Sequence, residues 1–195
     1  MRRKWNLTHF IAVGSLAALD VIVGLGASVI TAATGITMAS GVITSLTEPL
    51  LLMVCLFAID RLGAATLFMT IVAFLTLPLA YAGPPGFLPK IPIIILLGLI
   101  CDSLYLILKK LGRVVPSITI GGFLCLWYVF AVAYAARLLE VPGVDNFLNI
   151  MPIPILVTLV FLVGSTGGML GLLVYRRLEN SAVMVRLRAE GANQE

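Results

Sequence analysis

Three carboxylic acids lie inside long apolar segments of this 195-residue chain, where ionisable side chains are rare and usually functional. They are Asp20, Glu48 and Asp102, which follow the first residue of their segments by 11, 12 and 11 positions. At about 1.5 Å per helical residue, each acid falls near the middle of its segment. An acid at that depth must be protonated, paired or hydrated. The three acids are therefore candidate solute-binding or proton-carrying residues; alternatively, they are neutral acids that hydrogen-bond neighbouring helices.

Small and hydroxyl-bearing residues accompany two of these acids at helical spacing. They are Thr37, Ser40 and Thr44 before Glu48, and Gly24, Ala27, Ser28 and Thr31 after Asp20. Pro49 directly follows Glu48 and frees the backbone carbonyl of Ser45, which adds a hydrogen-bond acceptor nearby. The two stripes suit either a hydrated path from the outer face to the midplane or close helix packing through small residues.

An aromatic stripe and a polar loop form a second candidate region. The stripe consists of Phe123, Trp127, Phe130, Tyr134 and Arg137, in steps of four and three residues. Trp127 and Tyr134 could stack on a ring-shaped solute, and Asn146 and Asn149 in the following loop could bind its polar groups. The competing interpretations are packing or lipid contact for the aromatic residues and solvated turns for the asparagines.

The composition identifies the kind of element that positions these residues. Apolar residues make up 61% of the chain and charged residues 11%, and the mean hydropathy is +1.12. A soluble domain is about 45–50% apolar and about 25% charged. We therefore predict an integral membrane protein and exclude soluble enzymes and nucleic-acid-binding modules. The chain has no nucleotide-binding, metal-binding or nucleophile motif, so we expect no catalytic residue, metal or cofactor.

The apolar segments predict an all-α fold with six transmembrane helices in one membrane domain that covers residues 1–195. Their expected bounds are 9–31, 36–59, 62–81, 91–109, 114–137 and 149–175, followed by a short tail at 176–195. With both termini on one side, that side carries 11 of the 13 Lys and Arg residues, and the other carries Lys90 and Arg137. This asymmetry predicts that both termini are cytoplasmic.

Pairs of small residues four positions apart recur in the first and last segments. They are Gly14 and Ala18, Gly24 and Ser28, Gly164 and Gly168, and Gly167 and Gly171. Such pairs allow two helices to approach closely. The three cysteines, Cys55, Cys101 and Cys125, are scattered singly through apolar segments, so we predict that they are reduced and packed.

The size, the six spans and several stretches match the pattern of one family of membrane proteins. The stretches are Arg61 to Leu67, Leu77 to Leu79, Gly83 to Lys90, Gly98 to Asp102, and the glycine-rich Gly164 to Arg177. In these features the chain resembles the substrate-capture S components of energy-coupling factor (ECF) vitamin transporters. In size and number of spans it is also similar to the cell-shape protein MreD.

The resemblance to S components implies one small solute, a vitamin or its precursor, bound in the outer half under a lid of outer loops. It also implies a multi-pass protein of a prokaryotic plasma membrane that docks on a membrane-embedded coupling (T) subunit, which joins two ATPase subunits. The family docks through a small-residue motif in its first helix; that motif falls on Gly14 and Ala18 here, with Gly in place of the usual first Ala.

The charge pattern bears on the kind of solute. Three buried acids without a buried base favour a neutral or cationic solute, such as a thiamine-related pyrimidine, over one rich in carboxylates. Two other functions stay open at this point. A proton-coupled secondary transporter would use Asp20, Glu48 or Asp102 and would work alone, whereas a scaffold of the cell-shape type would bind no small molecule.

Overall fold

The computed structural model describes residues 5–34, 37–79, 86–139 and 152–181, and the regular elements in these ranges are all helical. The helices are α1 (Leu7–Thr34), α2 (Thr37–Ile59), α3 (Ala64–Leu75), α4 (Lys90–Leu108), the 3₁₀ helix η1 (Lys109–Leu111), α5 (Val114–Leu138) and α7 (Ile153–Leu178). Within these ranges, five helices are long and apolar enough to cross a membrane, and α3 is a shorter apolar helix. The chain is therefore an α-helical membrane protein.

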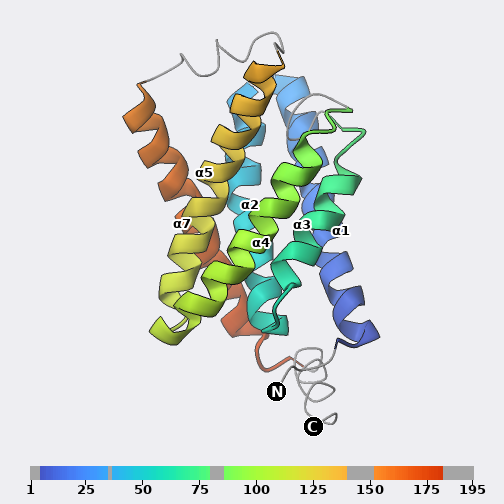
Figure 1. The fold of residues 1–195 in the computed structure, drawn as a ribbon, viewed down its shortest axis with the longest axis vertical. Helices are drawn as coiled ribbons and strands as arrows, with labels where there is room; N and C mark the ends of the chain where they lie inside the picture. The colour runs from blue at the N-terminus through green and yellow to red at the C-terminus, as the bar shows by residue number, and fades with distance from the viewer. Residues whose placement is uncertain (1–4, 35–36, 80–85, 140–151, 182–195) are drawn as a thin grey trace.

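The long helices stand side by side with α2 in the middle (Figure 1). Helix α2 contacts α1, α3, α5 and α7. The start of α1, the end of α7 and the turns at 60–63 and 109–113 lie at one end of the molecule (Figure 1). We call this the basic end, because Lys109, Lys110, Arg113, Arg176 and Arg177 belong to it. The opposite end, where α1 and α5 finish, is called the far end.

Polar contacts join the helices at the basic end. The hydroxyl of Tyr105 and the ammonium of Lys109 both donate to a carboxylate oxygen of Asp60, at 3.0 and 3.3 Å. Arg113, at the start of α5, forms a two-bond ion pair with Glu179 just after α7, with distances of 3.0 and 3.2 Å. These contacts hold the hairpins α2–α3 and α4–α5 and the end of α7 at a common level.

Helix α3 is shorter than the expected segment 62–81. It begins after Gly63, whose φ of 93° interrupts the helix and forms part of the tight turn between α2 and α3. It ends at Leu75, and Thr76 and Leu77 then form a turn. Pro78 accounts for this early end, because a residue that precedes proline is disfavoured in the helical conformation.

Glycines of α7 bring two neighbouring helices into close contact. A Cβ atom added at Gly167 or Gly171 would lie 2.5 Å from a carbonyl oxygen of α2, that of Leu46 or Leu50 respectively. On another face of α7, Cβ atoms at Gly164 and Gly168 would collide with carbonyl oxygens of α5. The prediction of close helix approach at these two glycine pairs is therefore confirmed.

Candidate functional site: a buried acid centre

Three polar side chains from three helices lie at a similar depth in the interior. Asp20 on α1 is fully buried, and Glu48 on α2 is 4% exposed. The hydroxyl of Tyr128, on α5, interacts electrostatically with both carboxyl groups. At about 1.5 Å per residue, the three residues lie roughly 15–21 Å from the far ends of their helices, which is a common depth. We call these three residues the acid centre.

The acid centre contains polar atoms whose hydrogen-bonding capacity is unused. Neither carboxyl oxygen of Asp20 has a hydrogen-bond partner within the described residues, and the buried hydroxyl of Tyr128 has none there either. Buried polar groups are nearly always hydrogen-bonded, because leaving one unsatisfied costs about 1–3 kcal/mol. A group that enters the centre with hydrogen-bond donors or a positive charge would remove this cost. The centre is therefore suited to bind such a group.

The backbone carbonyl of Ser45, which Pro49 frees, lies one turn before Glu48 and already accepts a hydrogen bond. The thiol of Cys125 donates to the carbonyl oxygen of Ser45 at 3.3 Å. The same thiol interacts electrostatically with Glu48. This contact joins α5 to α2 one turn before Glu48, and Tyr128 follows Cys125 by nearly one turn on α5. All three cysteines are free and buried, as predicted.

The structure gives Asp102 a role different from that of the other two acids. Its two carboxylate oxygens accept the backbone N–H groups of Ala65 and Thr66, at 3.0 and 2.9 Å, and the hydroxyl of Thr66 at 2.6 Å. Asp102 therefore caps the start of α3, where unpaired N–H groups and the helix dipole favour a negative charge. Its hydrogen bonds are made within the fold, whereas the Asp20 carboxyl oxygens have no partner among the described residues.

The expectation of a protein without a buried base is wrong. Lys90 is fully buried at the start of α4, and Arg61 is 7% exposed in the turn before α3. The ammonium of Lys90 donates to the carbonyl oxygen of Thr76 at the end of α3. A cation is favourable there because the carbonyl groups at a helix C-terminus carry partial negative charge. The sequence pattern placed Lys90 in an outer loop; Pro78 is a signal that α3 ends early, but it does not show that the side chain of Lys90 reaches that end.

The structure describes only part of the two polar stripes that were expected to run from the far end to the acid centre. Asp20, Gly24 and Ala27 are buried on one face of α1, as a stripe requires. The hydroxyls of Ser28 and Thr44 donate to carbonyl oxygens of their own helices, Leu25 and Gly41. The side chains of Thr31, Thr37 and Ser40 lie outside the described residues.

The aromatic stripe of α5 divides into a packed part and an exposed part. The indole N–H of Trp127 donates to the carbonyl oxygen of Ile93 on α4 at 3.3 Å, and its ring lies 6.0 Å from that of Phe123. Tyr134 is 64% exposed. The stripe therefore serves mainly to pack α5 on α4. The predicted site residues Asn146 and Asn149 fall outside the described residues.

Tyr128 is the site residue that sequence reasoning missed, although it directly follows Trp127. Its place in the centre depends on which face of α5 meets α2, and that face follows from the packing of α5 on α7 and from the contact between Cys125 and Ser45. A tyrosine at the same depth as two acids is the only signal in the sequence, and it does not specify the helix face.

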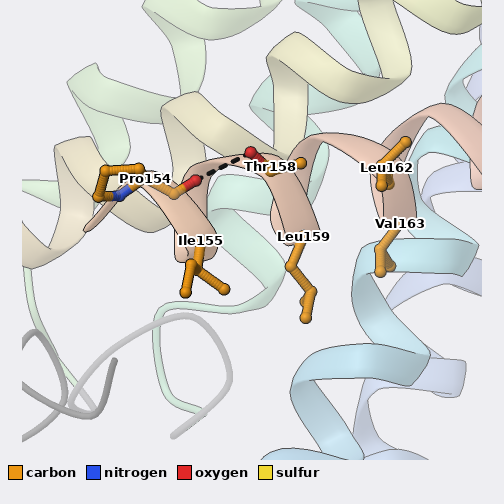
Figure 2. Close-up of a pocket in the computed structure, with 6 residues that line it drawn as sticks. All are labelled: Pro154, Ile155, Thr158, Leu159, Leu162 and Val163. Carbon is orange, nitrogen blue, oxygen red and sulfur yellow. Dashed lines mark hydrogen bonds between the residues drawn. The ribbon is translucent and has the colours of Figure 1, made fainter. Parts of the chain in front are cut away.

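An apolar groove lies along the far-end half of α7. It has a volume of about 460 Å³ and is lined by Pro154, Ile155, Thr158, Leu159, Leu162 and Val163, shown in Figure 2. The one hydroxyl in this set, on Thr158, donates to the carbonyl oxygen of Pro154 at 2.9 Å. The groove therefore offers apolar contact but no free donor or charge with which to recognise a polar solute.

Gly14 and Ala18 lie on a partly exposed face of α1. A Cβ atom at Gly14 would meet no described atom within 4 Å, unlike the glycines of α7. This face is therefore open to a further helix.

The described residues contain no cluster of three or more His, Cys, Asp or Glu side chains that could hold a metal ion. Comparisons of the chain with protein-family models, with curated proteins and with solved structures find no match.

Proposed function

We propose that this protein captures a small solute within the membrane, at the acid centre formed by Asp20, Glu48 and Tyr128. The observation that carries the proposal is the state of Asp20, which is fully buried with two carboxyl oxygens that no described residue satisfies. A purely structural acid would be bonded like Asp102, which accepts three hydrogen bonds.

The proposed topology has six crossings and cytoplasmic termini, with α3 as a short third crossing. The positive-inside asymmetry supports it, because 11 of the 13 Lys and Arg residues fall on the side of the termini. In this orientation the basic end is cytoplasmic, and solute reaches the acid centre from the far end, between the outer ends of α1, α2 and α5.

Within this function, we propose that the chain is the S component of an ECF importer. The chain lacks a nucleotide-binding motif, so a coupling subunit and two ATPases would supply the energy. The open face at Gly14 and Ala18 supports docking on that coupling subunit, because small residues let a second helix approach closely. The solute would be a vitamin or vitamin precursor, such as a thiamine-related pyrimidine.

The first test is mass spectrometry of the solutes that co-purify with the protein in mild detergent. We expect one small molecule in near-stoichiometric amount, and a strongly reduced amount in a folded Asp20→Asn variant. The absence of any solute from protein isolated from its native membrane would contradict the proposal and favour a scaffold.

The second test concerns docking and uses Ala18→Trp. A large ring on the open face of α1 would block helix approach without reaching the acid centre, because the side chain is partly exposed. We expect loss of the coupling subunit from pull-downs, while the dissociation constant for the solute changes by less than about threefold. Equal loss of docking and of solute affinity would show that this face is internal packing.

A proton-coupled secondary transporter is the second candidate, and the presence of two acids in one buried centre favours it. That function predicts uptake into liposomes that contain only this protein and are energised by a pH gradient. The S component predicts no such uptake until the coupling subunit and ATPases are added.

A further inference from the structure

The two acids described at the surface of the basic end are both paired with cations. Asp60 binds the ammonium of Lys109 at 3.3 Å, and Glu179 binds the guanidinium of Arg113 through two contacts of 3.0 and 3.2 Å. Each of these acids neutralises one cation. Every further exposed basic side chain at this end therefore adds a positive charge that no described surface acid balances.

Three basic side chains of this end have no polar partner among the described residues. Lys110, Arg176 and Arg177 are exposed and take part in no hydrogen bond or ion pair there. Lys110 precedes Arg113 by three residues and Glu179 follows Arg176 by three, so the ion pair of Arg113 with Glu179 joins the two basic segments (Figure 1). We call Lys110, Arg176 and Arg177 the unpaired cations.

The unpaired cations lie at the boundary of the apolar part of the molecule. They belong to the last residues of Lys90–Leu111 and Ile153–Leu178, two segments that are long and apolar enough to cross a membrane. Apolar side chains next to them are exposed, among them Leu111 at 65% and Leu173 at 50%. This surface is apolar on its membrane side and cationic at its edge, which matches the acyl chains and the phosphate of a phospholipid.

We propose that the unpaired cations bind the headgroup of an anionic phospholipid in the leaflet at the basic end. Guanidinium and ammonium groups both donate hydrogen bonds to phosphate oxygens. A lipid is favoured over an acidic protein surface because the exposed side chains on the membrane side of the cations are apolar and face hydrocarbon. The inference concerns the basic end alone and does not depend on solute capture at the acid centre.

The net charge of the lipid determines how tightly it binds. Phosphatidylglycerol is an anion, whereas phosphatidylcholine carries the same phosphate but is neutral because of its choline group. Each Lys or Arg near an anionic membrane surface strengthens binding by about fivefold. Because the three cations are exposed, added salt screens them and weakens the binding of the anionic lipid.

The first experiment measures the dissociation constants of these two lipids, with identical acyl chains, for the full-length protein in mixed micelles. We expect phosphatidylglycerol to bind at least about tenfold more tightly. Lys110→Gln and Arg176→Gln should each weaken its binding by about fivefold. The matched control is Arg137→Gln, which removes an exposed cation at the far end and should change nothing. Equal binding of the two lipids, or an equal effect of the control, would overturn the proposal.

The second experiment separates the lipid from the other possible ligands of a cationic surface. The variant in which all three unpaired cations are replaced by Gln should bind phosphatidylglycerol no more tightly than phosphatidylcholine. Inorganic phosphate should displace phosphatidylglycerol no better than chloride at equal ionic strength. Two results would overturn the proposal: displacement by phosphate alone, which indicates a phosphate site, or loss of a protein partner from pull-downs with lipid affinity unchanged.

Discussion

Asp102 and Asp20 are both buried acids, but their carboxyl groups differ in the hydrogen bonds that the surrounding helices give them. In the α3–α4 pair, Asp102 accepts three hydrogen bonds at the start of α3, and Lys90, twelve residues earlier on α4, donates to the carbonyl of Thr76 just after α3. In the α1–α2–α5 region, Asp20 has no such donor among the described residues. The difference shows that depth in the membrane does not reveal the role of an acid, whereas the groups bonded to it do.

The α3–α4 pair shows how a short helix is stabilised inside a membrane protein. Helix α3 has 12 residues, or about 18 Å at 1.5 Å per residue, and Lys90 and Asp102 are separated by a similar rise on α4. The negative side chain meets the positive end of the α3 dipole, and the positive side chain meets its negative end. Both charges of α4 are therefore used for stability, whereas the carboxyl oxygens of Asp20 have no hydrogen-bond partner among the described residues.

The largest expected effect in this comparison is that of Asp102→Asn on stability. The amide keeps the shape but loses the charge and part of the acceptor capacity for Ala65 and Thr66. We expect a loss of about 3–5 kcal/mol in the free energy of unfolding, because breaking a buried charged network is strongly destabilising. Denaturant titration in mixed micelles measures it. A loss below about 1 kcal/mol would mean that the cap is not important for stability.

The next effect concerns solute affinity in Glu48→Gln. This substitution removes the charge of a buried acceptor, and losing a charge-assisted hydrogen bond costs about 1.5–3 kcal/mol, or roughly 10- to 150-fold in dissociation constant. Equilibrium binding of the co-purified solute checks this. An unchanged dissociation constant in a folded variant would reduce Glu48 to a neutral acid that bridges helices.

A smaller loss is expected for Lys90→Met. The buried ammonium makes one hydrogen bond, to Thr76, where Asp102 makes three, and methionine also removes the cost of burying the charge. We expect a loss of about 1–2 kcal/mol in the free energy of unfolding. A loss as large as that of Asp102→Asn would show that the two ends of α3 are equally important.

The smallest effect on stability is expected for Asp20→Asn. No described residue bonds to the Asp20 carboxyl, so its replacement breaks no hydrogen bond to the described part of the chain and removes a buried ionisable group. We expect the free energy of unfolding of solute-free protein to stay within about 0.5 kcal/mol of wild type or to rise. A loss of several kcal/mol would place Asp20 in the same structural class as Asp102.

The sequence was sufficient to predict the helices and most of their bounds, because long uncharged runs and Gly/Pro clusters are local features. It was also sufficient to select Asp20 and Glu48, because a mid-segment acid is unusual in any context. It could not separate Asp102 from them, since that role depends on where α3 begins, and this is set by Gly63 and by the pairing of α3 with α4. Tyr128 and Lys90 were missed for the same reason, because both roles depend on helix–helix register.

The amount of solute that co-purifies with wild-type protein and with Asp20→Asn, compared at equal folded fraction, tests the central claim most directly. The account predicts near-stoichiometric solute on the wild type and at least about tenfold less on the variant, because Asp20 contributes free acceptors that only an occupant can use. Equal solute on the two proteins, or none on the wild type, would contradict the assignment of the acid centre as the binding site.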